Sequence, residues 1–140
     1  MIRQKALPAN IVQRIETLGT LFERCPEIVF AYLFGGAGVA RLTPLSDVDV
    51  AVYLQDAEDR TEQVASLLAK VAAHLGTDEV DLVVLNAAPI ALLGRILRTR
   101  RVICDRAPLV RHNFESRTFR EFCDFRRFER RALDRRFEHG

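Results

Sequence analysis

The feature that most constrains the fold is an apolar run followed by two glycines and, after ten intervening residues, by two aspartates. The run from Ile28 to Phe34 has the composition of a buried strand and ends on Gly35 and Gly36. Asp47 and Asp49 then open an alternation to residue 54, with valine or leucine at every second position. Because side chains alternate between the two faces of a strand, the two carboxylates share one face.

The two aspartates are candidates for holding a metal ion. Like charges that are held close together repel, and a cation between them removes the repulsion. Carboxylate oxygens are hard ligands that suit Mg²⁺. Taken singly, an Asp-x-Asp pair is more often a strand edge or a turn, and Gly-Gly is usually only a tight turn.

A third carboxylate makes the set more specific. Asp81 lies at the start of another apolar strand, from Val80 to Leu85. If that strand pairs beside the first, all three acids converge at one edge of the sheet below the glycine turn. Backbone N–H groups of such a turn approach a triphosphate closely, and three carboxylates provide for two metal ions. The residues therefore point to phosphoryl transfer.

The remaining elements follow from periodicity and from stop signals. Apolar residues at helical spacing predict helices over residues 8–22, 64–75, from 89 to about 98, and from 108 onward. A short strand is predicted over 102–104. The cluster Arg98 to Arg101 has two interpretations, phosphate contact or favourable charge at a helix C-terminus, and we favour the second. The 140 residues are enough for one domain, with a core over 1–105 and a C-terminal helix over 106–140.

The C-terminal segment is rich in arginine and phenylalanine. Residues 106–140 carry ten basic and six acidic side chains, whereas the whole chain has a net charge of only +2. Six phenylalanines are too many for one narrow apolar stripe, so some must lie outside the core. A protein interface, a nucleic-acid site and a terminal helix with a solvated charged face are all consistent with this pattern. We favour the protein partner, because interleaved acids weaken the case for nucleic acid.

Composition excludes several classes of protein. No apolar run approaches the roughly 20 residues of a membrane helix, and the first residues lack the apolar core of a secretory signal. Cys25, Cys104 and Cys123 have no metal-ligand spacing, and an odd number suggests reduced thiols. We therefore expect a cytoplasmic protein with no membrane partner.

The stretch around the glycines and aspartates resembles the minimal nucleotidyltransferases of the DNA polymerase beta superfamily. Their motif is an apolar residue, Gly, then Gly or Ser, a spacer, and Asp-x-Asp. The run from Thr43 to Leu54 is similar to the MntA antitoxins, which pair with HepT, a toxin with a HEPN-type RNase fold. Residues 114–125 also resemble the MntA tail. The likeness implies an α/β (α+β) nucleotidyltransferase fold, with a small mixed β-sheet flanked by helices and a long C-terminal helix.

The resemblance also implies an activity and a partner. It implies Mg²⁺-dependent transfer of AMP from ATP to a tyrosine hydroxyl of a HepT-like toxin, which would make this chain an antitoxin. Two Mg²⁺ ions would be held by three carboxylates, and the third of these would accept the hydroxyl proton. The implied metal-binding and catalytic residues are Asp47, Asp49 and Asp81, and the implied nucleotide contacts are Gly35, Gly36 and Ser46. The C-terminal helix would be the surface on which HepT docks, with homo- or hetero-oligomers possible.

The sequence departs from the family at the glycine turn. MntA-like turns read Gly-Ser-x-Ala-Arg-Gly, whereas this chain has Gly36 at the serine, Val39 at the arginine and Ala40 at the last glycine. Arg41 is close enough in sequence to replace the missing cation. Two alternatives follow: an antitoxin that neutralises its partner by binding alone, or a small-molecule nucleotidyltransferase of the aminoglycoside type. The retained aspartates oppose the first, and the lack of a second domain opposes the other.

Overall fold

The computed structural model describes residues 6–38, 42–43, 46–56 and 59–139, with side chains described as far as residue 136. The elements follow in the order α1 (Ile11–Glu16), α2 (Leu18–Glu23), β1 (Ile28–Phe34), α3 (Gly35–Gly38), β2 (Val48–Leu54), α4 (Thr61–Leu75), β3 (Val80–Val84), α5 (Ile90–Thr99), β4 (Arg101–Asp105) and α6 (Pro108–His139).

The strands form one mixed sheet in the order β3-β2-β1-β4. β1 is antiparallel to both of its neighbours, β2 and β4, whereas β2 and β3 are parallel. Parallel neighbours need a crossover connection, and α4 provides it between β2 and β3. The fold class expected from the family resemblance, a small mixed sheet with flanking helices, is therefore confirmed.

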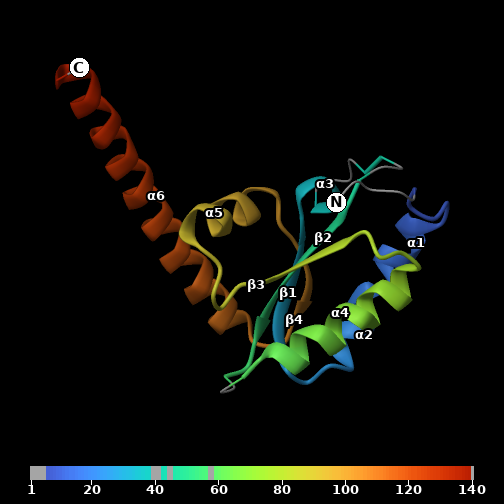
Figure 1. Cartoon of the computed structure of the whole chain (residues 1–140). Coiled ribbons are helices and arrows are strands. Elements are labelled where there is room, and N and C mark those ends of the chain that lie inside the picture. Colours follow the sequence, from blue (N-terminus) through green and yellow to red (C-terminus); the bar gives the residue numbers. More distant parts are fainter. Residues whose placement is uncertain (1–5, 39–41, 44–45, 57–58, 140) are drawn as a thin grey trace.

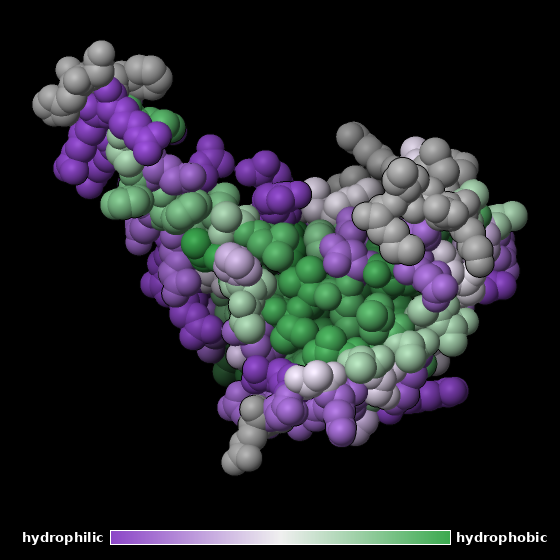
Figure 2. All heavy atoms as spheres, viewed as in Figure 1, coloured by the Kyte–Doolittle hydropathy of each residue, from purple (hydrophilic) through white to green (hydrophobic). Residues whose placement is uncertain are grey.

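Helices cover both faces of the sheet (Figure 1). Val50 and Val52 belong to an apolar cluster with residues of α1, α2 and α4. Ala51 and Tyr53 point the other way, into a second cluster with α5 and the beginning of α6. The alternation predicted for this strand is confirmed, and it places Asp49 on the α5–α6 face. In Figure 2, apolar side chains gather at the middle of the visible face, where the edge strand β3 lies.

The single helix predicted over residues 8–22 is wrong, because the chain divides there into α1 and α2 at Thr17. The Thr17 hydroxyl donates to the Arg14 carbonyl at 3.0 Å, and His74 Nε2 lies 3.0 Å from the same oxygen. That carbonyl would accept the Leu18 amide in a continuous helix, so these side chains compete with the helix for it. The apolar residues on both sides of the break still face the core, since Ile15 and Leu18 are both buried.

Only the first part of α6 packs against the body, and the remainder runs past it (Figure 1). Phe114 and Thr118 are buried, whereas Phe119 and Phe128 are 64% and 71% exposed. The helix predicted from residue 108 is confirmed, as is the expectation that some phenylalanines lie outside the core. The outer length of α6 carries mostly hydrophilic side chains (Figure 2). Among the helices of the described residues, none has the length and apolarity that crossing a bilayer requires.

The three cysteines are free thiols. Cys25 and Cys104 are buried in the main apolar cluster, and Cys123 on α6 is half-buried. Burial raises the pKa of both Cys25 and Cys104, which keeps these thiols protonated. They are therefore small core residues, as expected.

A buried polar network attaches α6 to the sheet. Glu115, only 9% exposed, accepts a hydrogen bond from the Tyr32 hydroxyl at 2.7 Å. Arg100 donates to the same carboxylate at 2.7 Å, and Arg111 donates to it at 2.9 Å while also bonding Asp105. Burial raises the pKa of Glu115, but these hydrogen bonds and the arginine charges outweigh burial and hold that pKa below its ordinary value of 4.5. The network therefore depends on an ionised Glu115.

Changing Glu115 to glutamine is expected to lower the free energy of unfolding by about 3 kcal/mol at pH 7, because Arg100 and Arg111 lose their carboxylate partner. Since the folded pKa is depressed, the wild-type contribution is present above pH 4.5 and is lost as the pH falls through the folded value. The variant should lack this acid-dependent loss. Urea unfolding at pH 7 and at steps down to pH 3 measures both effects.

The matched control is Glu121→Gln, an exposed acid on the same helix, for which a change within about 0.5 kcal/mol is expected. If the Glu115 variant matched the control at pH 7, the network would not be what attaches α6.

Candidate active site

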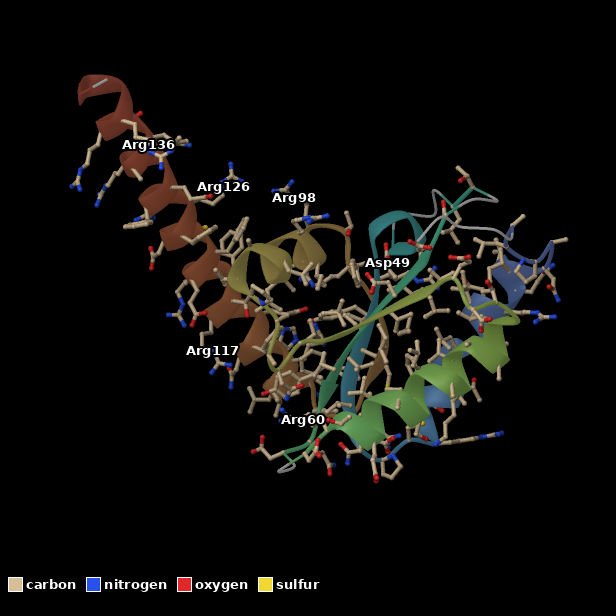
Figure 3. All side chains as sticks on the ribbon, in the orientation of Figure 1. Asp49, Arg60, Arg98, Arg117, Arg126 and Arg136 are labelled. Carbon is tan, nitrogen blue, oxygen red and sulfur yellow. The ribbon has the colours of Figure 1, made fainter. Side chains whose placement is uncertain are left out.

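Two of the predicted acids lie side by side on neighbouring strands. Asp49 is the second residue of β2, Asp81 is the second residue of β3, and the two are partners in the parallel register. Neighbouring strands lie about 4.8 Å apart, and in-register side chains of a parallel pair share a face. Asp47 lies two residues before Asp49, just ahead of β2. The edge where β2 and β3 begin therefore carries all three carboxylates, with Asp49 below α3 in Figure 3.

The Asp49 carboxylate also lies against the glycine turn. Phe34, the last residue of β1, is the antiparallel partner of Asp49, so the turn begins beside this carboxylate. Gly35 has a φ of 60°, and a Cβ at this position would stand 2.5 Å from Asp49 Oδ2. Both the left-handed backbone and the lack of space require glycine here.

The end of α5 holds the glycine turn in place. The Gly35 amide donates to the Thr99 hydroxyl at 2.8 Å. At Gly38 the turn approaches the Thr99 carbonyl so closely that a Cβ would stand only 2.0 Å from its oxygen. Sequence analysis missed Thr99, because it lies 64 residues from Gly35 and belongs to no motif. The Gly35 amide, predicted to contact phosphate, is engaged by this threonine in the structure.

Ser46 closes a local turn in front of β2. Its hydroxyl accepts the Thr43 amide at 2.9 Å, and its own amide donates to the Thr43 carbonyl at 3.0 Å. These bonds direct the chain into β2 and so position Asp47 and Asp49. The role of Ser46 in contacting a nucleotide stays a prediction.

The chemistry of the site suits a divalent cation. Asp47 and Asp81 are exposed, and Asp49 is half-buried. Among the described residues, however, no three Asp, Glu, His or Cys side chains converge on one point that would hold a metal. A shared ion would therefore need rotation of these side chains. The oxygen donors fit Mg²⁺, and the role of the three acids as its ligands stays a prediction.

The arginine cluster at the end of α5 divides into different roles. Arg100 bonds Glu115 and the Leu97 carbonyl, and Arg101 pairs with Glu16 at 3.0 Å. Arg98 is exposed and points away from the body (Figure 3). Arg100 and Arg101 therefore hold segments of the fold together, through Glu115 and Glu16.

Part of the glycine turn cannot be compared with the family pattern. Val39, Ala40 and Arg41, where the sequence departs from MntA-like turns, lie outside the described residues. The proposal that Arg41 replaces the missing cation therefore stays a prediction.

No curated protein matches the sequence. One solved chain, from a toxin–antitoxin complex with AMP-PNP, is 22% identical with a TM-score of 0.70, and the match covers 89% of this chain and 98% of that chain. Another, from tri-AMPylated Shewanella oneidensis HEPN toxin in complex with MNT antitoxin, is 21% identical with a TM-score of 0.65, covering 90% and 97%. A chain of the toxin–antitoxin MntA-HepT is 22% identical, with a TM-score of 0.64 and the same coverage.

At these identities the solved structures show a shared fold. The family is established by sequence, since residues 16–109 match the family described as polymerase beta, nucleotidyltransferase. This match includes the glycine turn, the aspartates at the start of β2 and β3, and the threonine that ends α5. It spans more than half of the chain, and the sheet has the mixed order expected for such a domain. The chain belongs to the polymerase beta nucleotidyltransferase family.

Proposed function

We propose that this chain is a protein adenylyltransferase, and that it acts as an antitoxin by transferring AMP from ATP to a tyrosine hydroxyl of a HEPN-type toxin. The observation that carries the proposal is the pairing of Asp49 with Asp81 in register, directly beside Gly35. The fold shared with complexes that contain AMP-PNP or an AMPylated toxin supports the choice of nucleotide and acceptor. We further propose that several AMP units are added in series.

In this proposal the three aspartates hold two Mg²⁺ ions. When bound, Mg²⁺ neutralises charge on the phosphate oxygens and lowers the pKa of the attacking hydroxyl. Asp81 is exposed at the edge strand, where an acceptor reaches it, and it takes the hydroxyl proton. The oxygen then bonds to the α-phosphorus, and pyrophosphate leaves.

The phosphate contacts are assigned to groups at the turn. Gly36 starts α3 together with Gly35, and an amide in the first turn of a helix has no acceptor within that helix. Gly36 is therefore the better candidate for a phosphate oxygen, because Thr99 already accepts the Gly35 amide. Ser46 would contact the nucleotide through its hydroxyl.

The docking surface for the toxin is proposed to be the part of α6 that carries Phe128, which does not line the groove between α5 and α6. Its outer part leaves Phe128 71% exposed, and exposed aromatic and arginine side chains are typical anchors of protein interfaces. Changing Phe128 to alanine is expected to weaken the toxin complex about tenfold or more, which calorimetric titration would measure. The control is Val12→Ala on α1, where the side chain is 61% exposed. Equal affinities for the two variants would place the interface elsewhere.

The test of the function is co-expression with a HEPN toxin, incubation with labelled ATP and Mg²⁺, and intact-mass analysis of both chains. We expect the toxin to gain mass in steps of one AMP. A change of its acceptor tyrosine to phenylalanine should prevent the gain. A stable complex without added mass would contradict the transferase.

That last outcome would favour the second candidate, an antitoxin that acts by binding alone. The observation in its favour is the altered glycine turn, in which Val39 replaces the arginine of MntA-like proteins. The retained aspartates argue against it, since clustered acids without a cation only destabilise a fold.

A further inference from the structure

A groove lies between α5 and α6 on the side of the molecule where Arg98 and Arg126 extend (Figure 3). Its volume is about 760 Å³, within the range of roughly 300–1,000 Å³ that is usual for ligand sites. The two helices meet closely because α5 has Gly94 at the contact, where a Cβ would stand 2.2 Å from the Phe122 ring. Phe122 therefore forms part of the floor, and the exposed Phe119 ring lies at the same groove.

The groove is strongly basic. Five arginines line it, namely Arg98, Arg100, Arg126, Arg127 and Arg130, against a single acid, Glu115. Glu115 is already bonded to Arg100, and Arg127 has Asp124 at 3.8 Å. Within the described part of the chain, no ion pair involves Arg98, Arg126 or Arg130.

The charge pattern of α6 explains this surplus of arginines over acids in the groove. Positions 119, 122, 126 and 130 follow helical spacing and face the groove, and the charged residues among them are arginines. The acids Glu121 and Asp124 fall on other faces of the helix and do not line the groove. An anionic occupant is therefore favoured over a neutral one.

The side chains also indicate which anion fits. Arginine binds phosphate through two parallel hydrogen bonds, and aromatic rings stack on nucleobases. Phe119 and Phe122 place aromatic rings beside Arg126, which itself lies 5.8 Å from the centre of the Phe122 ring. Phosphates and flat rings together describe a short run of linked nucleotides better than they describe an acidic peptide.

One end of the groove lies near the candidate active site. Arg98, which lines the groove, directly precedes Thr99, which holds the Gly35 amide. In Figure 3, Arg98 on α5 lies between the labels of Asp49 and Arg126. The groove therefore includes the residue next to the one that holds the glycine turn.

We propose that the α5–α6 groove binds the adenylate chain already attached to the acceptor, so that the next AMP is added to its end. This inference rests on the serial transfer proposed above. In the second step a ribose hydroxyl oxygen of the attached AMP forms a bond to the α-phosphorus of a new ATP. The bond from that phosphorus to the β-phosphate bridging oxygen breaks, pyrophosphate leaves, and the hydroxyl proton passes to Asp81 and then to water.

The site is tested first without the toxin, by fluorescence polarisation of a fluorescein-labelled adenylate trinucleotide with the full chain. The double variant Arg126→Glu, Arg130→Glu should weaken binding at least about tenfold. The matched control, Arg120→Glu with Arg131→Glu, makes the same charge change on the same helix at exposed positions outside the groove. It should bind as wild type does. Thermal melting of every variant shows whether it is folded. The milder pair Arg126→Gln, Arg130→Gln removes the charges without reversing them, so a loss of binding can be distinguished from a loss of folding.

The second test counts AMP units on a co-expressed HEPN toxin by intact mass. Wild type should give a series of products, whereas the groove variant should stop after the first AMP. If the wild-type protein adds no AMP to the toxin, the proposed function is refuted. Trinucleotide binding would still show whether the groove binds an adenylate chain. The inference is overturned if wild type does not bind the trinucleotide or if the groove variant binds it equally well. Loss of the toxin complex with trinucleotide binding unchanged would make the groove a protein interface.

Discussion

Changing Asp47 and Asp49 together to asparagine is expected to reduce AMP transfer at least about a thousandfold, while the fold and the toxin complex persist. Asparagine keeps the shape of each side chain but removes the charge that attracts the cation. Loss of even one preorganised electrostatic contact typically costs about 10²–10³ in rate. Asp47 is exposed and Asp49 half-buried, so core packing changes little. Time courses of toxin mass with ATP and Mg²⁺, together with melting curves, measure both parts.

The control for this pair is Asp56→Asn with Asp124→Asn, which removes two exposed carboxylates away from the edge where β2 and β3 begin. Transfer by the control should remain at the wild-type rate. Chelation of Mg²⁺ should reproduce the loss in wild type. Transfer that continues in the Asp47 and Asp49 variant would refute the two-metal interpretation of these residues.

Changing Gly35 to alanine is expected to reduce both activity and stability. The residue has a φ of 60°, which costs an alanine about 1–2 kcal/mol. The new Cβ would also stand 2.5 Å from Asp49 Oδ2, so this carboxylate must move. We expect the free energy of unfolding to fall by about 2 kcal/mol and transfer to fall at least about a hundredfold, because small displacements at a reacting centre are costly. Denaturant unfolding and toxin mass provide the two measurements.

The Gly76→Ala variant separates the backbone penalty of a left-handed alanine from the displacement of Asp49. Gly76 ends α4 with a φ of 72°, so the backbone penalty is similar. A Cβ there would meet the end of the Arg14 side chain, which is free to rotate away, and no residue of the site is involved. This variant should lose about 1 kcal/mol of stability and transfer AMP normally. If the Gly35 variant behaved in the same way, its contact with Asp49 would have no role in the reaction.

Much of the fold could be predicted because the patterns are local. The apolar run of β1, the alternation along β2 and the stop at Gly76 each depend on neighbouring residues. The same is true of the long helix from Pro108. The error at Thr17 shows the limit of this reasoning. The apolar spacing continues through the break at Thr17. What ends α1 is the Thr17 hydroxyl together with His74, since both contact the Arg14 carbonyl, and apolar periodicity reveals neither contact.

The candidate site was predictable in its residues but not in their arrangement. The glycines and aspartates stand out because few structural roles need both a left-handed turn and paired carboxylates. The sequence did not show that Asp49 packs on Gly35, or that Thr99 holds the Gly35 amide. It also could not show that Arg100 would be used to bind Glu115 while its near neighbour Arg98 lines a groove.

The sequence by itself determined most of the elements, the glycine turn, the three acids and the resemblance that implies the chemistry, because each depends on residues a few positions apart. Only the tertiary structure decided that β3 lies parallel to β2 with Asp81 beside Asp49, and that α5 closes against both the glycine turn and α6. The physical reason is that these contacts join segments tens of residues apart. Their pairing depends on how both faces of one sheet are covered, which periodicity along a single segment does not reveal.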